Sequence, residues 1–156
     1  MWGLTACDGP GDFKTSAIDG TEREFFSYSA RGPDDRDDGT LAPTALGGSI
    51  AFAPEIVLPA LAAIKARYGS AIYGRYGFLD SFNPTLTDPA LNHLIKEGGI
   101  VPGVAWVDDD YLGIDQGPIL TMIANYRDAF IWRLMRRSAP VVAGLRTAGF
   151  TGGWLA

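Results

Sequence analysis

Asp115 is the residue of this 156-residue chain whose position most clearly suggests chemistry. It precedes a segment in which apolar residues recur at helical spacing as far as Arg137, which predicts a long helix with Asp115 as its N-cap. Backbone N–H groups and the helix dipole favour the ionised form there. We therefore expect a fixed anion that orients a hydroxyl, holds a water or accepts a proton. The alternative is that Asp115 only caps its helix.

A second carboxylate, Glu55, follows Pro54 at the start of a helix predicted over Pro54–Tyr68. Proline suits the first helical position and an acidic residue suits the first turn. The simplest interpretation is that Glu55 matches the helix dipole. The alternative is a role in a site.

An aromatic loop over residues 73–84 combines aromatic rings with Asp80 and Asn83. Such a composition suits sugars, because pyranose rings present apolar C–H faces to aromatics and hydroxyls to carboxylates and amides. The alternative is that Tyr76, Phe78 and Phe82 anchor the loop into the core.

The elements that would position these residues are predicted to be helices joined by long loops. The expected helices are a short one within 41–50, Pro54–Tyr68, a short one over 88–97 capped by Thr87, 115–137, and a last one from Ser138 to Ala148. We find no convincing strand alternation. Gly, Pro and Asp crowd the first fifty residues, which predicts long ordered loops with a function. The expected fold class is all-α.

Composition excludes several classes of protein. The net charge is −5 without a basic cluster, so nucleic acid is not an expected partner. Neither a membrane-spanning run nor a signal-peptide pattern is present, which leaves the compartment unknown. One cysteine, Cys7, and one histidine, His93, exclude an internal disulfide and a multi-histidine metal site. We expect neither a metal nor a cofactor.

Five ordered motifs carry a resemblance to a known family. They are W-G-L-T-A-C-D-G-P (2–10), D-G-T-L-A-P-T-A (38–45), F-A-P-E (52–55), Y-G-F-L-D-S-F-N (76–83) and I-D-Q-G-P-I-L-T-M-I-A-N-Y-R (114–127). Together they resemble the C-terminal part of the bacterial glycoamylase-like family, which includes endo-β-1,2-glucanases and a domain of cyclic β-1,2-glucan synthases. The resemblance implies an (α/α)6 toroid and a glucan partner. It also implies a place of action in the periplasm or outside the cell, as for members of that family.

The resemblance also implies that residues 1–156 form a single C-terminal fragment of that catalytic domain. We expect a partial toroid of about four helices, whose exposed faces lead to self-association or marginal stability. Cys7 and Ala124 stand where the family usually has Ser and often has Glu. The absent upstream part makes activity of this chain alone an open question.

Within this frame, a glycoside hydrolase mechanism needs one protonated and one ionised carboxyl group. The candidate catalytic residues are Asp115, Glu55 and Asp8, with Asp115 as the base and a proton donor that can lie upstream. The candidate sugar-binding residues are Trp2, Tyr76, Phe78, Asp80, Asn83 and Gln116. The alternatives are a non-catalytic carbohydrate-binding or interaction fragment and an inactive remnant of a truncated gene.

Overall fold

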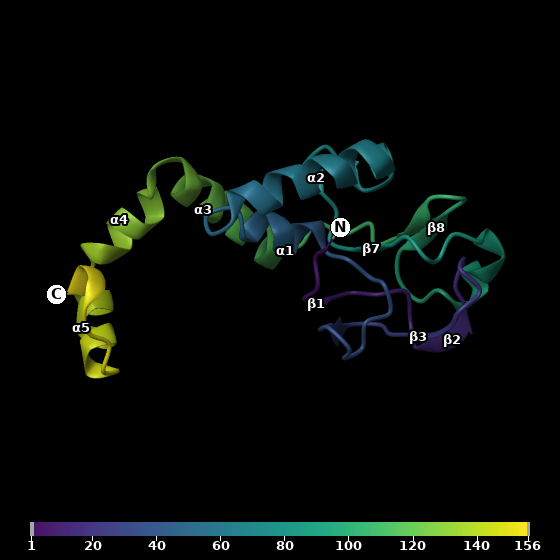
Figure 1. The fold of residues 1–156 in the computed structure, drawn as a ribbon, viewed down its shortest axis with the longest axis horizontal. Helices are drawn as coiled ribbons and strands as arrows, with labels where there is room; N and C mark the ends of the chain where they lie inside the picture. The colour runs from purple at the N-terminus through teal and green to yellow at the C-terminus, as the bar shows by residue number, and fades with distance from the viewer. Residues whose placement is uncertain (1, 156) are drawn as a thin grey trace.

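The computed structural model describes residues 2–155 and has a mixed architecture of helices and small sheets (Figure 1). The expectation of an all-α partial toroid is therefore wrong. The strands are β1 (Ala6–Cys7), β2 (Phe13–Ser16), β3 (Glu22–Phe25), β4 (Ser29–Ala30), β5 (Tyr73–Gly74), β6 (Gly77–Phe78), β7 (Phe82–Asn83), β8 (Gly99–Val101) and β9 (Ala105–Val107). Most span only two or three residues, which is too short for an alternating pattern to be recognised in the sequence.

The helices agree better with prediction. They are α1 (Pro43–Gly48), α2 (Pro54–Tyr68), α3 (Gly113–Asp128), α4 (Phe130–Arg136) and α5 (Ala139–Thr147), with 3-10 helices η1 (Gly69–Ala71), η2 (Pro89–Leu94) and η3 (Gly153–Leu155). The bounds of α2 are confirmed. Ser138 is the N-cap residue of α5, as expected. The short helix near 88–97 is a 3-10 helix whose cap is Asp88 rather than Thr87, because the Asp88 carboxylate accepts the Ala90 N–H.

The predicted helix over 115–137 is two helices. Ala129 adopts a left-handed conformation with φ 57°, and the Asn125 side chain accepts the Trp132 N–H across the break at 3.0 Å. At the other end, Leu112 is the N-cap residue, so α3 begins before Asp115. Asp115 lies in the first turn and makes no cap. In Figure 1, α4 and α5 continue away from the part of the chain that holds the sheets.

The sheet β7-β9-β8 lies between two apolar clusters. Ala105 and Val107 of β9 belong to a cluster with residues of α1 and α2, whereas Trp106 packs with Phe25 and Leu86. Alternate side chains of a strand point to opposite faces, so this three-residue strand joins both clusters. The antiparallel pairing of Phe82 with Val107 then brings the residues before β7 beside those after β9.

A buried amide connects this sheet to the N-terminal loops. Asn83 donates to the Asp38 carbonyl at 3.0 Å and to the Thr40 hydroxyl at 3.1 Å, and it accepts the Thr85 N–H at 3.0 Å. Its amide is therefore fully engaged inside the protein, and it holds the loop before α1 against β7.

We expect Asn83→Ala to lower the free energy of unfolding by about 2–4 kcal/mol, because it leaves several buried polar groups without partners. Chemical denaturation measures this loss. Thr121→Ala is the control, since its exposed hydroxyl bonds only to the Pro118 carbonyl, and its effect should stay within about 0.5 kcal/mol. Equal effects of the two substitutions would contradict the structural role of Asn83.

Candidate active site

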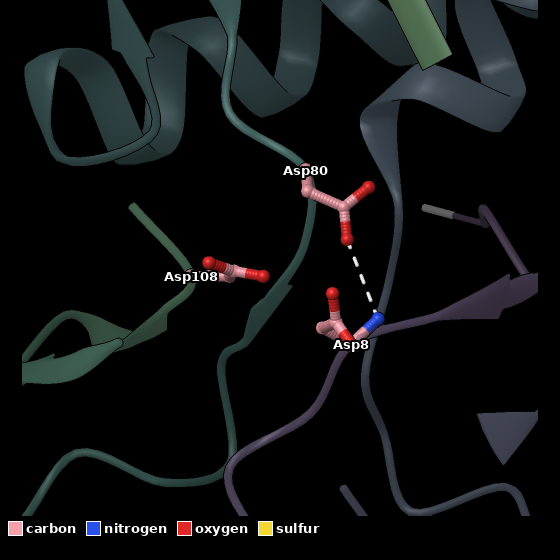
Figure 2. A group of neighbouring side chains, drawn as sticks. All are labelled: Asp8, Asp80 and Asp108. Atoms are coloured by element: carbon pink, nitrogen blue, oxygen red, sulfur yellow. Dashed lines mark hydrogen bonds between the residues drawn. The ribbon is translucent and has the colours of Figure 1, made fainter. Parts of the chain in front are cut away.

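Three aspartates converge from three separate segments of the chain (Figure 2). Asp8 follows β1, Asp80 precedes β7 and Asp108 follows β9. Each contributes a carboxylate oxygen, and these oxygens lie within 4.8 Å of one another. We call these three residues, together with Asp115, the carboxylate cluster.

Backbone hydrogen bonds fix Asp80 and Asp108 relative to each other. The Asp80 N–H donates to the Asp110 carbonyl at 3.1 Å, and the Asp108 N–H donates to the Ser81 carbonyl at 3.0 Å. Both residues are only 2 % exposed. The antiparallel pairing of β7 with β9 thus continues into the cluster, which has rigid backbone on two sides.

Asp8 is joined to the same segment by two further bonds. Its N–H donates to the Asp80 carboxylate at 3.4 Å, as the dashed line in Figure 2 shows, and its carbonyl accepts the Ser81 hydroxyl at 2.8 Å. Asp8 is half-buried. The loop after β1 is therefore held against the residues that precede β7.

Asp115 reaches the cluster from the first turn of α3, where its carboxyl group shares a hydrogen bond with Asp80. A hydrogen bond between two carboxyl groups needs a proton on one of them. Asp115 also lines an open groove of 360 Å³ together with Trp2, Thr5, Thr44 and Ser49. Of the four residues in the cluster, Asp115 lines this groove, whereas Asp80 is buried.

Burial and mutual repulsion favour the protonated forms. Burial first, and then the charge of Asp115, raise the pKa of Asp80 to about 7, although the Asp8 N–H opposes this. Burial also raises the pKa of Asp108 to about 6, and neighbouring aspartates add to the effect. The largest cause of the raised pKa of Asp115 is burial, followed by the opposing hydrogen bond with Asp80 and then by the charge of Asp8.

Burial shifts the pKa of Asp115 upward, opposite to the effect of the helix dipole, and the ionised base predicted for this residue stays a prediction. Partial burial and neighbouring negative charge outweigh the dipole at the start of the helix. Within the pair it is Asp80, with a pKa of about 7, that keeps a proton near neutral pH, and a proton held in this way can be donated.

Of the other residues expected in a site, Trp2 lies in the groove, whereas Glu55 lies on the surface in the first turn of α2, outside the cluster. Tyr76 is exposed and packs edge-on against Tyr111. The Phe78 carbonyl accepts the Gln116 side-chain amide at 3.0 Å, which links β6 to α3.

Asp108 was not among the residues expected in a site. In the sequence, Asp108 could have been found as the first residue of an acidic run that directly follows the apolar segment Ala105–Val107. That segment forms β9, and its pairing with β7 brings Asp108 close to Asp80. The Oδ2 atom of Asp108 is buried and has no hydrogen-bond partner among the residues that the structure describes. The spacing of the Asp8, Asp80 and Asp108 oxygens also suits a hard cation, and the expectation that no metal binds remains a prediction.

Residues 1–139 match the Glycoamylase family model, described as "Putative glucoamylase", and the chain belongs to that family. The suspected resemblance is confirmed. Among residues 2–155, the helices are all too short or too polar to cross a membrane.

Named relatives of this chain act on β-1,2-glucans. An exo β-1,2-glucooligosaccharide sophorohydrolase of Parabacteroides distasonis is 31 % identical over 146 residues, which are 93 % of this chain and 16 % of the relative. The solved endo-β-1,2-glucanase of Chitinophaga pinensis is 29 % identical with a TM-score of 0.67, over 99 % of this chain and 29 % of its own. The solved β-1,2-glucanase of Parabacteroides distasonis is 31 % identical with a TM-score of 0.65, over 93 % of this chain and 16 % of its own. This chain therefore spans less than a third of each relative.

Proposed function

We propose that the chain carries the proton-donating half of a glycoside hydrolase site that acts on a β-glucan, with β-1,2-linked glucan as the preferred substrate. The observation that supports this most directly is the hydrogen-bonded Asp115–Asp80 pair, of which Asp115 lines the groove. The linkage is inferred from the named activities of the relatives. This assignment makes Asp115 a proton donor rather than the base that its sequence position suggested.

In the proposed step, the pair holds one proton and Asp115 delivers it to the glycosidic oxygen as the bond between that oxygen and the anomeric carbon breaks. The leaving sugar departs as an alcohol, and the charge of the Asp115–Asp80 pair changes from one negative to two. A water activated by the second carboxylate adds to the anomeric carbon and gives its proton to that carboxylate. Asp80 has two roles: it holds the proton of the pair before the reaction, because burial and the charge of Asp115 raise its pKa to about 7, and it passes that proton to Asp115 through their hydrogen bond. It acts through Asp115 because its own side chain is buried and does not line the groove.

For an inverting mechanism, the second carboxylate lies outside the cluster. An inverting site leaves roughly 6.5–9.5 Å between its two carboxyl groups to admit a water, whereas the oxygens of Asp8, Asp80 and Asp108 lie within 4.8 Å of one another. We therefore treat the cluster as one acidic unit. Glu55 is the remaining candidate base within this chain, and the length that the relatives have in excess of this chain can also supply that carboxylate.

We further propose that residues 1–156 form a C-terminal fragment of the catalytic domain, and that its aromatic residues bind sugar rings. Trp2 is 38 % exposed within the groove, so its ring can stack on the apolar face of a pyranose. Tyr76 is a second exposed ring, on the β5–β6 turn. Asn83 is not included as a sugar ligand, because its amide is engaged by internal hydrogen bonds.

The alternative function is glucan binding without turnover, which the groove with its exposed Trp2 also supports. Two measurements on the purified chain separate these functions: release of reducing sugar from β-1,2-glucan, and a calorimetric binding titration with the same glucan. Sugar release supports hydrolysis, whereas affinity without release supports the alternative. If neither signal exceeds that with β-1,4-glucan, both functions are excluded and the chain is an inactive remnant.

Exposed apolar side chains on α3 and α4 lead us to propose self-association. Leu120, Phe130 and Leu134 are each at least 46 % exposed, and contiguous apolar surface of this kind favours association. We expect sedimentation velocity to show species larger than a monomer, and Leu134→Lys to shift the distribution toward the monomer. Thr121→Lys is the control for added charge on the neighbouring helix α3. A wild-type chain that remains a monomer at all concentrations would contradict this proposal.

A further inference from the structure

A fully buried ion pair lies beneath the loop that carries Asp8. The side chains of Arg31 and Asp38 are both 0 % exposed, and two nitrogens of the guanidinium contact the two carboxylate oxygens at 3.0 and 3.2 Å. Such a bidentate pair fixes the plane of the guanidinium. Its remaining donors therefore point in defined directions.

Those donors bind backbone carbonyls from two loops. One terminal nitrogen donates to the Cys7 carbonyl at 2.7 Å and to the Ser29 carbonyl at 3.1 Å. The other donates to the Phe26 and Ser27 carbonyls at 3.0 and 3.1 Å, in addition to Asp38. Every N–H of the guanidinium thus has an acceptor. The bonds to Cys7 and Ser29 also tie Arg31 to the ends of the paired strands β1 and β4.

The contacts of Arg31 lie on both sides of Asp8. The residue before Asp8 is held by the short bond to the Cys7 carbonyl. The residue after it is Gly9, where a Cβ would collide with the guanidinium and with the Phe26 carbonyl. The backbone around Asp8 therefore rests directly on the Arg31 side chain, and glycine is required at position 9 by this close approach.

We propose that Arg31 is a positioning residue for the active site, which fixes the backbone on both sides of Asp8 and so holds the Asp8 N–H against the Asp80 carboxylate. The ion pair with Asp38 orients the guanidinium, the guanidinium fixes Cys7 and Gly9, and Asp8 then meets Asp80. The catalytic meaning of this inference rests on the proposed function. The geometry itself can be tested without glucan.

The groups that face Asp80 determine whether its pKa rises or falls when the contact with the Asp8 N–H is lost. Negative charge comes from Asp115 on α3 and from Asp108 after β9, while the Asp8 N–H is the donor that lowers the pKa of Asp80. Loss of that N–H contact removes a partner of the ionised form, so the pKa of Asp80 should rise. One hydrogen bond of ordinary strength corresponds to a change of about 0.4 to 1 pH unit.

The test compares Arg31→Lys with Asp38→Asn in the full chain. Lysine keeps the positive charge beside Asp38 but cannot reach the carbonyls of both loops, because its three donors share one atom. Asparagine at 38 weakens the same buried pair and leaves the guanidinium against Cys7. We expect both substitutions to lower the thermal midpoint of unfolding. Arg31→Lys should raise the Asp80 titration midpoint, measured by carbon-13 NMR of the carboxyl groups, above its value near 7. Asp38→Asn should raise it by less, because the guanidinium loses an orienting partner but keeps its bonds to the Cys7 carbonyl.

A second variant keeps the inference testable if Arg31→Lys does not fold. Ser81→Ala removes the other hydrogen bond that holds Asp8 and leaves Arg31 unchanged, so it should move the Asp80 midpoint in the same direction by a smaller amount. Equal Asp80 midpoints in the wild type, Arg31→Lys and Ser81→Ala overturn the proposal, as does an equal rise in Asp38→Asn. If the midpoint rises as expected but no glucan is cleaved, the positioning stands and the proposed function alone fails.

Discussion

Replacing Asp115 by asparagine should lower the rate of β-1,2-glucan cleavage by roughly 10²- to 10⁴-fold, the usual contribution of a positioned general acid. Asparagine preserves the shape of the side chain and its place in the groove, but it has no acidic proton to give to the leaving oxygen. The loss should therefore appear in the rate of the chemical step and leave glucan affinity nearly unchanged. Release of reducing sugar and a binding titration measure the two effects.

Asp128→Asn is the matched control, because Asp128 lies at the opposite end of the same helix and pairs only with Arg133 at the exposed surface. We expect its rate to equal that of the wild type. A second readout does not depend on turnover: the charge of Asp115 raises the pKa of Asp80, so Asp115→Asn should lower the Asp80 titration midpoint. Unchanged cleavage together with an unchanged midpoint would show that Asp115 is not the proton donor.

How much of the site was visible in the sequence depended on local chemistry. Asp115 and Asp8 stand out because helix-start rules and short motifs act over a few residues. The upward shift in the pKa of Asp115 could not be read from the sequence, because the dipole is a local feature whereas burial and the charge of Asp8 depend on the fold. Electrostatic character is set by groups that only the fold brings together.

The fold shows the same division between local and long-range information. The helix Pro54–Tyr68 was predicted with its observed bounds, since proline and glycine mark its two ends. The strands were missed because a pair such as Phe82–Asn83 with Ala105–Val107 is stabilised by contacts across the chain rather than by any periodicity. Asn83 illustrates the consequence: its type suggested a sugar ligand, and its buried position between two segments makes it an internal link.

The break between α3 and α4 at Ala129 also depends on a contact that the sequence pattern does not reveal. Apolar periodicity continues through the residue and predicts one helix. The left-handed conformation at Ala129 is closed by the Asn125 side chain, which takes the Trp132 N–H. That bond depends on one side chain seven residues before its donor, so a search for glycine or proline as a helix breaker does not find it.

Asp80 lowers the free energy of unfolding of the chain as the pH rises above about 4. Its pKa is about 7 in the folded chain and about 3.9 when unfolded, so the folded state holds a proton that the unfolded state releases. Below about pH 4 both states are protonated and the group contributes nothing. As the pH rises from about 4 to 7 the folded state loses stability, and above 7 the full penalty applies.

Asp80→Asn should therefore stabilise the chain at pH 8 by ~2 to 4 kcal/mol and change its stability little at pH 4, as measured by denaturant unfolding at both values. Asp108→Asn is the matched comparison. It should show the same sign over a window that ends near pH 6, where Asp108 titrates. Asp12 and Asp19, whose pKa values are lowered by hydrogen bonds, add stability with rising pH only below about 4, outside this window. A wild-type chain whose stability increases from pH 4 to 8, with Asp80→Asn no more stable at pH 8, would mean that the cluster does not hold the extra proton on which donation to a glucan depends.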